Sequence, residues 1–204
     1  MFLVAPFLVA CTPGLADGTF ATGSSTVVTS AGHDAVYVVD QDAGRLVRHG
    51  TDGSVSLVAV GSRPARVARA GRGLLVSLRG DRGIAEVVDD AGSLRLVGVT
   101  PVGAEPVGLV ASEDGRRVYV ALSLEDAVLE LDGSTLVERR RWTVANQPHW
   151  LALHPSGATL YVSTAMGGHL HAVDLVADRV VELDLPAVTG AGDEGDDTLS
   201  RRFT

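Results

Sequence analysis

The stretch VANQPHWLALHPSGATLYVST, residues 144–164, contains the pattern that decides the fold of this chain. It opens with a turn that ends in Pro148, and two similar turns occur earlier, VGSRP at 60–64 and VGAEP at 102–106. The prolines that close these turns are 42 residues apart each time. A period of this size is typical of solenoids and propellers. Most of the stretch is therefore interpreted as one period of a repeating architecture.

Alignment on the three prolines divides the chain into four units, 25–64, 65–106, 107–148 and 149–190. The third unit shows four strand-length segments separated by turns of Gly, Asp and Ser: VGLVAS, RVYVAL, AVLELD and LVERRRWTV. AVLELD alternates apolar and polar residues, as a strand with one buried face does. Four short antiparallel strands in about 42 residues predict one blade of a β-propeller. The sequence thus predicts an all-β fold with four such blades.

Three segments resemble the YVTN-type repeat of bacterial β-propellers, which is related in pattern to WD40 repeats: VYVVD (36–40), VYVAL (118–122) and LYVST (160–164). The turns SEDG (112–115) and HPSG (154–157) match the turn that precedes the YV strand in that family. The resemblance covers most of residues 25–185, but the Asn that names the repeat is absent from all four units. It implies a closed ring of about seven blades. We therefore expect the four blades to be part of a larger ring.

The composition excludes several classes of function. The chain has 204 residues, 46% of them apolar, and a net charge of -8, and all 17 of its basic residues are Arg. An acidic chain with no basic tract does not match the electrostatics of nucleic-acid binding, and without Lys there is no Schiff-base or P-loop lysine. The motifs GxSxG, HExxH and GxxxxGK[ST] are also absent from the sequence. The absence of a catalytic motif favours a protein that is not an enzyme and leaves an enzymatic role as the alternative; no nucleic-acid partner is expected.

The N-terminus resembles that of a bacterial lipoprotein. The apolar run MFLVAPFLVAC ends in Leu8-Val9-Ala10-Cys11, which is similar to a lipobox, where the Cys is diacylated and becomes the new N-terminus. The positive n-region of a signal peptide is missing, which indicates an incomplete leader. The resemblance implies a signal peptide over 1–10, a lipid on Cys11, a linker over 11–24 and attachment to the cell envelope, facing the periplasm or the outer membrane. A buried free Cys is the alternative.

The C-terminal segment 191–204 carries an acidic run, Asp193, Glu194, Asp196 and Asp197. Its spacing matches no known calcium loop, and adjacent like charges flanked by Gly are typical of a solvated segment. We expect a disordered or truncated tail here.

Candidate ligand-binding residues follow from the propeller resemblance. In such propellers, the connections entering the inner strands and those joining the second and third strands open on one face, where ligands usually bind. In this chain these are the Pro turns and the connections 40–45, 79–83, 123–127 and 163–169. The residues that they place on this loop face include Asp81, Glu105, Asp126, His149, Trp150 and His169.

His149-Trp150 is the pair that the repeat does not explain, because the preceding blades have Ala65-Arg66 and Val107-Gly108 there. His169 lies on the facing connection, and His171 shares its side of the strand. The three imidazoles of His149, His169 and His171 could bind a transition metal, the one cofactor that we consider. The alternative is that the histidines bond backbone carbonyls and that Trp150 fills a gap between blades.

Three functions remain open at this point. The first is a lipid-anchored scaffold of the cell envelope that binds a protein, a glycan or a small molecule on its loop face. The second is a metal- or cytochrome-linked redox protein. The third is a lactonase-like hydrolase, which rests on fold analogy alone.

Overall fold

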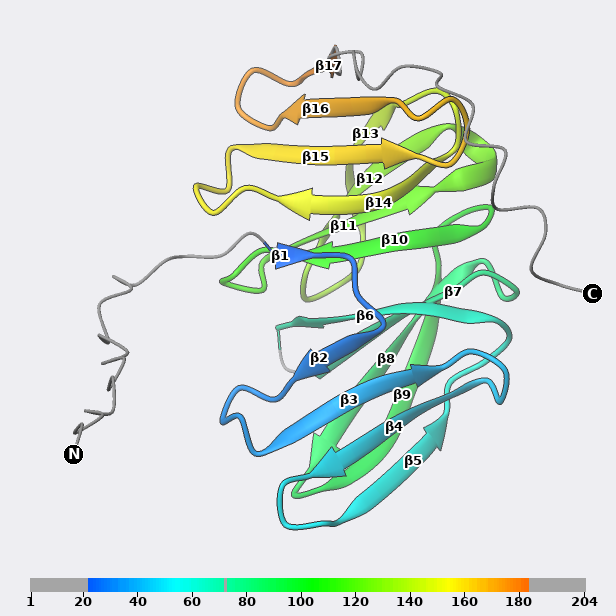
Figure 1. Cartoon of the computed structure of the whole chain (residues 1–204), viewed down its shortest axis with the longest axis vertical. Helices are drawn as coiled ribbons and strands as arrows, with labels where there is room; N and C mark the ends of the chain where they lie inside the picture. Colours follow the sequence, from blue (N-terminus) through cyan, green and yellow to red (C-terminus); the bar gives the residue numbers. More distant parts are fainter. Residues whose placement is uncertain (1–21, 72, 184–204) are drawn as a thin grey trace, which may run out of the picture.

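The computed structural model of the chain describes residues 22–71 and 73–183, which form four antiparallel sheets in succession (Figure 1). The first blade contains β2 (Val27–Thr29), β3 (Ala35–Asp40), β4 (Arg45–Gly50) and β5 (Val55–Ala59). The second contains β6 (Pro64–Ala70), β7 (Gly73–Leu78), β8 (Gly83–Asp90) and β9 (Ser93–Pro101). The third contains β10 (Pro106–Ala111), β11 (Arg117–Leu122), β12 (Ala127–Asp132) and β13 (Glu138–Thr143), with the 3-10 turn η1 (Ser123–Glu125). The fourth contains β14 (Pro148–Leu153), β15 (Thr159–Thr164), β16 (Leu170–Asp174) and β17 (Arg179–Leu183), and β1 (Thr22–Gly23) is added to it.

The predicted all-β fold of four-stranded blades is confirmed, and within each blade the strands pair in sequence order. The inner strands of blades two to four begin at Pro64, Pro106 and Pro148 themselves, one residue before the unit boundaries 65, 107 and 149. Pro has no N–H for a ladder, so it fits the first residue of a strand. The ladder shifts register directly after each of these prolines.

The residues before the three prolines share a conformation that is rare for them. Arg63, Glu105 and Gln147 have φ angles of 49°, 55° and 58°. The left-handed region is unfavourable for a residue with a Cβ atom. The repeat therefore fixes the backbone of the Pro turns at a cost in conformational energy, and the neighbouring contacts described below hold them there.

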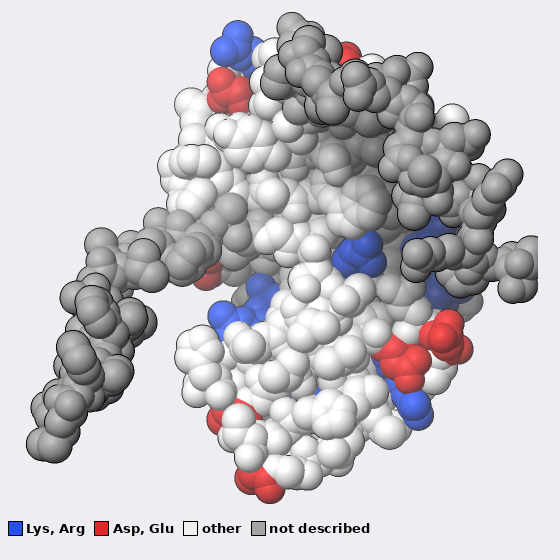
Figure 2. Space-filling model, in the orientation of Figure 1, with Lys and Arg blue, Asp and Glu red and all other residues white. Residues whose placement is uncertain are grey.

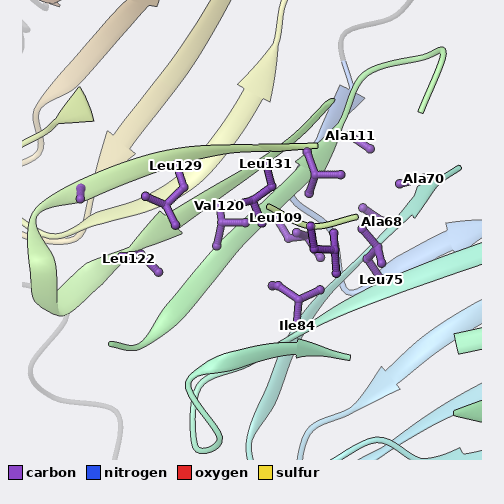
Figure 3. Close-up of a cluster of buried hydrophobic side chains, with 13 residues drawn as sticks. Ala68, Ala70, Leu75, Ile84, Leu109, Ala111, Val120, Leu122, Leu129 and Leu131 are labelled. Carbon is purple, nitrogen blue, oxygen red and sulfur yellow. The ribbon is translucent and has the colours of Figure 1, made fainter. Parts of the chain in front are cut away.

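The core is divided into three layers, one between each pair of successive blades. Tyr37 and Leu46 of the first blade pack with Leu74 and Val76 of the second. The layer between blades two and three gathers aliphatic side chains that include Ile84, Leu109, Val120 and Leu129 (Figure 3). The third layer joins Tyr119 and Trp142 to Leu151, Leu160 and Val162.

The described residues directly before β2 bond to the inner strands of other blades. β1 pairs with the inner edge of β14, with Gly23 opposite Ala152. The Ser24 hydroxyl accepts hydrogen bonds from the Leu109 and Leu151 backbone N–H groups, both at 3.1 Å. Ser25 then forms a bridge with Val67. Residues 22–25 therefore contact the inner strands of blades four, three and two before the chain enters the first blade.

The predicted lipid site at Cys11, the leader over 1–10 and the tail over 191–204 lie outside the described residues. Within 22–71 and 73–183, no helix is long and apolar enough to cross a membrane.

Candidate functional site

The acidic residues of the second-to-third connections bind the Pro turns of the loop face. Asp81 Oδ2 accepts a hydrogen bond from Ser62 N at 2.6 Å, and Asp126 Oδ1 accepts one from Gln147 N at 2.9 Å. Glu125 accepts from Ala104 N, and this bond lowers the pKa of its carboxyl group. These carboxylates hold the turns in place. Ligand contact by Asp81 and Asp126 stays a prediction.

Glu105 lies in the second Pro turn and pairs with Arg79 from the end of β7. Arg79 Nε donates to Glu105 Oε1 at 2.9 Å, and Arg79 Nη2 contacts the same oxygen. The Glu105 side chain is 16% exposed, against 37% for Arg79. The pair joins blades two and three at the loop face and neutralises one Arg there.

Arg66, on β6, carries a half-buried guanidinium group close to this pair. Its Nη1 atom donates to the Ala65 carbonyl at 2.9 Å. Among the described residues no carboxylate lies within ion-pair distance of Arg66, and burial followed by the charge of Arg79 lowers the pKa of its guanidinium. Arg66 is therefore a partly desolvated cation whose charge is not balanced by the described part of the chain.

His149 faces the same charges from β14 in the fourth blade. Burial, and after it the charges of Arg66 and Arg79, lower the pKa of the His149 imidazole. Its Nδ1 atom is buried and has no hydrogen-bond partner in the structure. A neutral imidazole with a free nitrogen thus lies within electrostatic reach of the Arg66 guanidinium.

Trp150 supplies an apolar wall next to His149. The two ring centroids are 4.2 Å apart and the ring planes are inclined by 55°. The ladder of β14 shifts register between Pro148 and Trp150, which brings these consecutive side chains together. Trp150 is 47% exposed, so its ring does not simply fill a gap between the blades of this chain.

His169 and His171 form a second group on the fourth blade, with ring centroids 6.4 Å apart. His169 Nδ1 contacts Glu182, and His171 Nε2 lies 3.9 Å from the same carboxylate. In the described ranges no three His, Cys, Asp or Glu side chains are arranged so that they could hold a metal ion. A transition metal at His149, His169 and His171 stays a prediction. Analysis of bound Zn, Cu and Fe in the protein, against the His149→Ala/His169→Ala variant, tests it.

The opposite rim contains a cavity of about 340 Å³ between the first three blades, lined by Ser30, Tyr37, Arg69, Leu74, Asp89 and Glu113 among others. The Tyr37 hydroxyl donates to Asp89 Oδ2 at 2.6 Å, and Arg48 Nε donates to the same oxygen at 2.9 Å. Burial, and then Asp89, raise the pKa of Tyr37 to about 12. Tyr37, Arg48 and Asp89 satisfy one another in this wall, which makes it a weaker candidate than the loop face.

Sequence reasoning missed Arg66. The sequence contains a signal for it, because Ala65-Arg66 is the counterpart of His149-Trp150 in the repeat. The structure brings both pairs to the same face.

No family model matches this chain. It is 28% identical over 128 residues to a virginiamycin B lyase of Nocardia farcinica, a match that covers 62% of this chain and 45% of the lyase. Among solved structures, the hydrazine synthase of Kuenenia stuttgartiensis matches with a TM-score of 0.69 and 23% identity, over 76% of this chain and 47% of that one. The virginiamycin B lyase of Staphylococcus aureus matches with a TM-score of 0.66 and 11% identity, over 80% of this chain and 56% of that one.

The fold is a β-propeller. The chain spans about half the length of the relatives it matches. At these identities the solved structures support the fold, and the YVTN-type repeat stays a resemblance.

Proposed function

We propose that this propeller is a binding protein whose loop face takes a small anionic ligand, a carboxylate or a phosphate, at Arg66 and His149. The observation that carries the proposal is the unbalanced charge of Arg66. Its half-buried guanidinium lacks an acidic partner among the described residues, and a second Arg lies near it.

The physical argument rests on desolvation. Removing a cation from water costs several kcal/mol unless a counter-charge compensates for it. A guanidinium group offers a planar fork of donors that matches carboxylate and phosphate oxygens. An anion bound there would compensate Arg66, and His149 could donate a hydrogen bond to it.

Substitution of Arg66 by Gln should weaken anion binding about tenfold or more, because a hydrogen bond to a charged group contributes about 1.5–3 kcal/mol. Isothermal titration with inorganic phosphate and with benzoate measures both ligand classes. Arg69→Gln is the matched control, because Arg69 lies on the same strand and lines the cavity of the opposite rim. Equal losses in the two variants, or no binding by the unmodified protein, would contradict the proposal.

The pH dependence provides a second prediction. His149 has a lowered pKa in the folded protein, so as the pH falls below about 6.5 the unfolded chain takes up the proton first. Above that pH, His149 is neutral in both states and the full stability is present. As the pH falls from there to the pKa of folded His149, the free energy of unfolding decreases. A bound anion favours the protonated ring, so anion affinity should rise over the same range. Urea unfolding and titrations at several pH values should show both trends, and His149→Gln should reduce both.

We also propose that Cys11 carries a lipid that attaches the protein to the bacterial cell envelope. Support comes from the lipobox-like run Leu8 to Cys11, which lies outside the described residues. Mass spectrometry of the membrane fraction should find a diacylated N-terminal Cys. An unmodified Cys11, or equal membrane association of the Cys11→Ser variant, would refute the anchor.

An enzymatic role is the second candidate, favoured by the 28% identity to a virginiamycin B lyase. If this chain shares that activity, incubation with virginiamycin B should yield a cleaved product by mass spectrometry. Absence of product from the folded protein would exclude the lyase activity and would not affect the binding proposal.

A further inference from the structure

The end blades of the chain each present an apolar sheet face that points away from the neighbouring blade. In the first blade, the cross-strand register forms one row from Val27, Val38, Val47 and Leu57. In the fourth blade, the register forms another row from Ala152, Tyr161, Ala172 and Val181. We call these the blade-1 face and the blade-4 face. Leu57 is 55% exposed and Val181 is 42% exposed.

The repeat shows that the blade-4 face is one half of a blade-to-blade contact. Tyr161 is the counterpart of Tyr37 and Tyr119, 124 and 42 residues earlier in the sequence. Tyr37 packs against the second blade and Tyr119 against the fourth, and they are only 5% and 1% exposed. Tyr161 is only half-buried. The blade-4 face thus has the residue type that elsewhere packs on the following blade.

The blade-1 face is the other half of the same contact. Val38 is the counterpart of Val120 and Val162, which are fully buried against the preceding blade. Val38 itself is half-buried. The two end faces are therefore complementary by repeat, because each internal contact of the chain joins one face of each kind.

The arrangement of the blades favours a half ring. In Figure 1, β2 to β5 and β14 to β17 both lie in front of the two central blades, so the end faces point to the same side. Over β3 to β5, the surface in Figure 2 is largely free of charged side chains.

We infer that two copies of this chain close one ring, with the blade-4 face of each copy packed on the blade-1 face of the other. The two-fold axis would run along the central channel, and both loop faces would open on the same side. Contacts that join unlike faces form rings when the rotation closes. A ring of about eight blades is within the range that propellers form. The inference continues an interface already present three times in the chain. Trp150 lies on the same side of β14 as Ala152, so it belongs to the blade-4 face that the second copy would cover.

The molar mass of the full 204-residue chain, measured by light scattering during gel filtration, tests this inference. The unmodified protein should have twice the 21.1 kDa mass of one chain. Leu57→Lys and Val181→Asp should each give the mass of one chain. A ring of two copies has two contacts between a blade-1 face and a blade-4 face, and each substitution places a charge in both of them. A mixture of the two variants should form dimers again. One contact then has two unmodified faces, and the other pairs Lys with Asp.

Val97→Lys is the matched control, because Val97 is 49% exposed on β9 of the second blade and belongs to neither end face. This variant should remain dimeric, with circular dichroism equal to that of the unmodified protein. A one-chain mass for the unmodified protein overturns the inference. A dimer that is lost with Leu57→Lys but kept with Val181→Asp would mean that two blade-1 faces meet, which also overturns it.

Discussion

Substitution of Arg140 by Leu should lower the free energy of unfolding by about 3 kcal/mol, because it leaves a buried carboxylate without its main partner. Glu130 is 3% exposed, and Arg140 Nε donates to its Oε2 atom at 3.0 Å. Arg117 lies 4.0 Å from the other oxygen and compensates it only weakly. Arg140 also donates to the Leu175 carbonyl at 2.8 Å and stacks on Trp142 at 4.8 Å. It therefore links the third blade to the fourth.

Urea unfolding followed by Trp fluorescence measures this loss. Arg139→Leu is the matched control, because its partner Asp132 is on the surface, and exposed pairs contribute about 0–1 kcal/mol. The double variant Arg140→Leu/Glu130→Leu should regain much of the stability, since it removes the buried charge together with its partner. Equal effects of Arg139→Leu and Arg140→Leu would show that the buried pair has no special weight.

Substitution of Ser24 by Ala should lower the free energy of unfolding by about 2–4 kcal/mol, because two backbone N–H groups lose their acceptor. These are the N–H groups of Leu109 and Leu151, which belong to inner strands of different blades. Their amide hydrogens should exchange faster with solvent in the variant, as measured by NMR.

Ser25→Ala is the control for Ser24→Ala. The Ser25 hydroxyl bonds only to Val27, two residues away and exposed. Its loss should cost less than about 1 kcal/mol. If Ser24→Ala were no more destabilising than this control, the hydrogen bonds of Ser24 to the inner strands would be of no consequence for stability.

The strands could be predicted from the sequence because they repeat. Segments such as RVYVAL and AVLELD coincide with β11 and β12, since alternation and turn residues mark both of their ends. The run Arg139 to Arg141 lies on the outer strand β13, and all three side chains form ion pairs. The register that places Arg140 opposite Glu130 could not be read from the run itself.

The candidate site was predicted only in part. Glu105, His149 and Trp150 were assigned to the loop face from their places in the repeat. The electrostatic effect of Arg66 on His149 was not, because it depends on how blades two and four are placed relative to one another in space. Asp81 and Asp126 look like ligand contacts in the sequence, yet a carboxylate in a short connection serves equally well to bind a backbone N–H group.

The contacts of residues 22–25 set the order in which this protein can fold. Ser24 bonds to residues 85 and 127 positions further along the chain. Such distant contacts close large loops and form late. A ribosome delivers the N-terminus first, so the first described residues must wait until the fourth blade has been synthesised. If a lipid holds the chain at Cys11, any pull from the membrane acts first on β1, the element with the last-formed contacts.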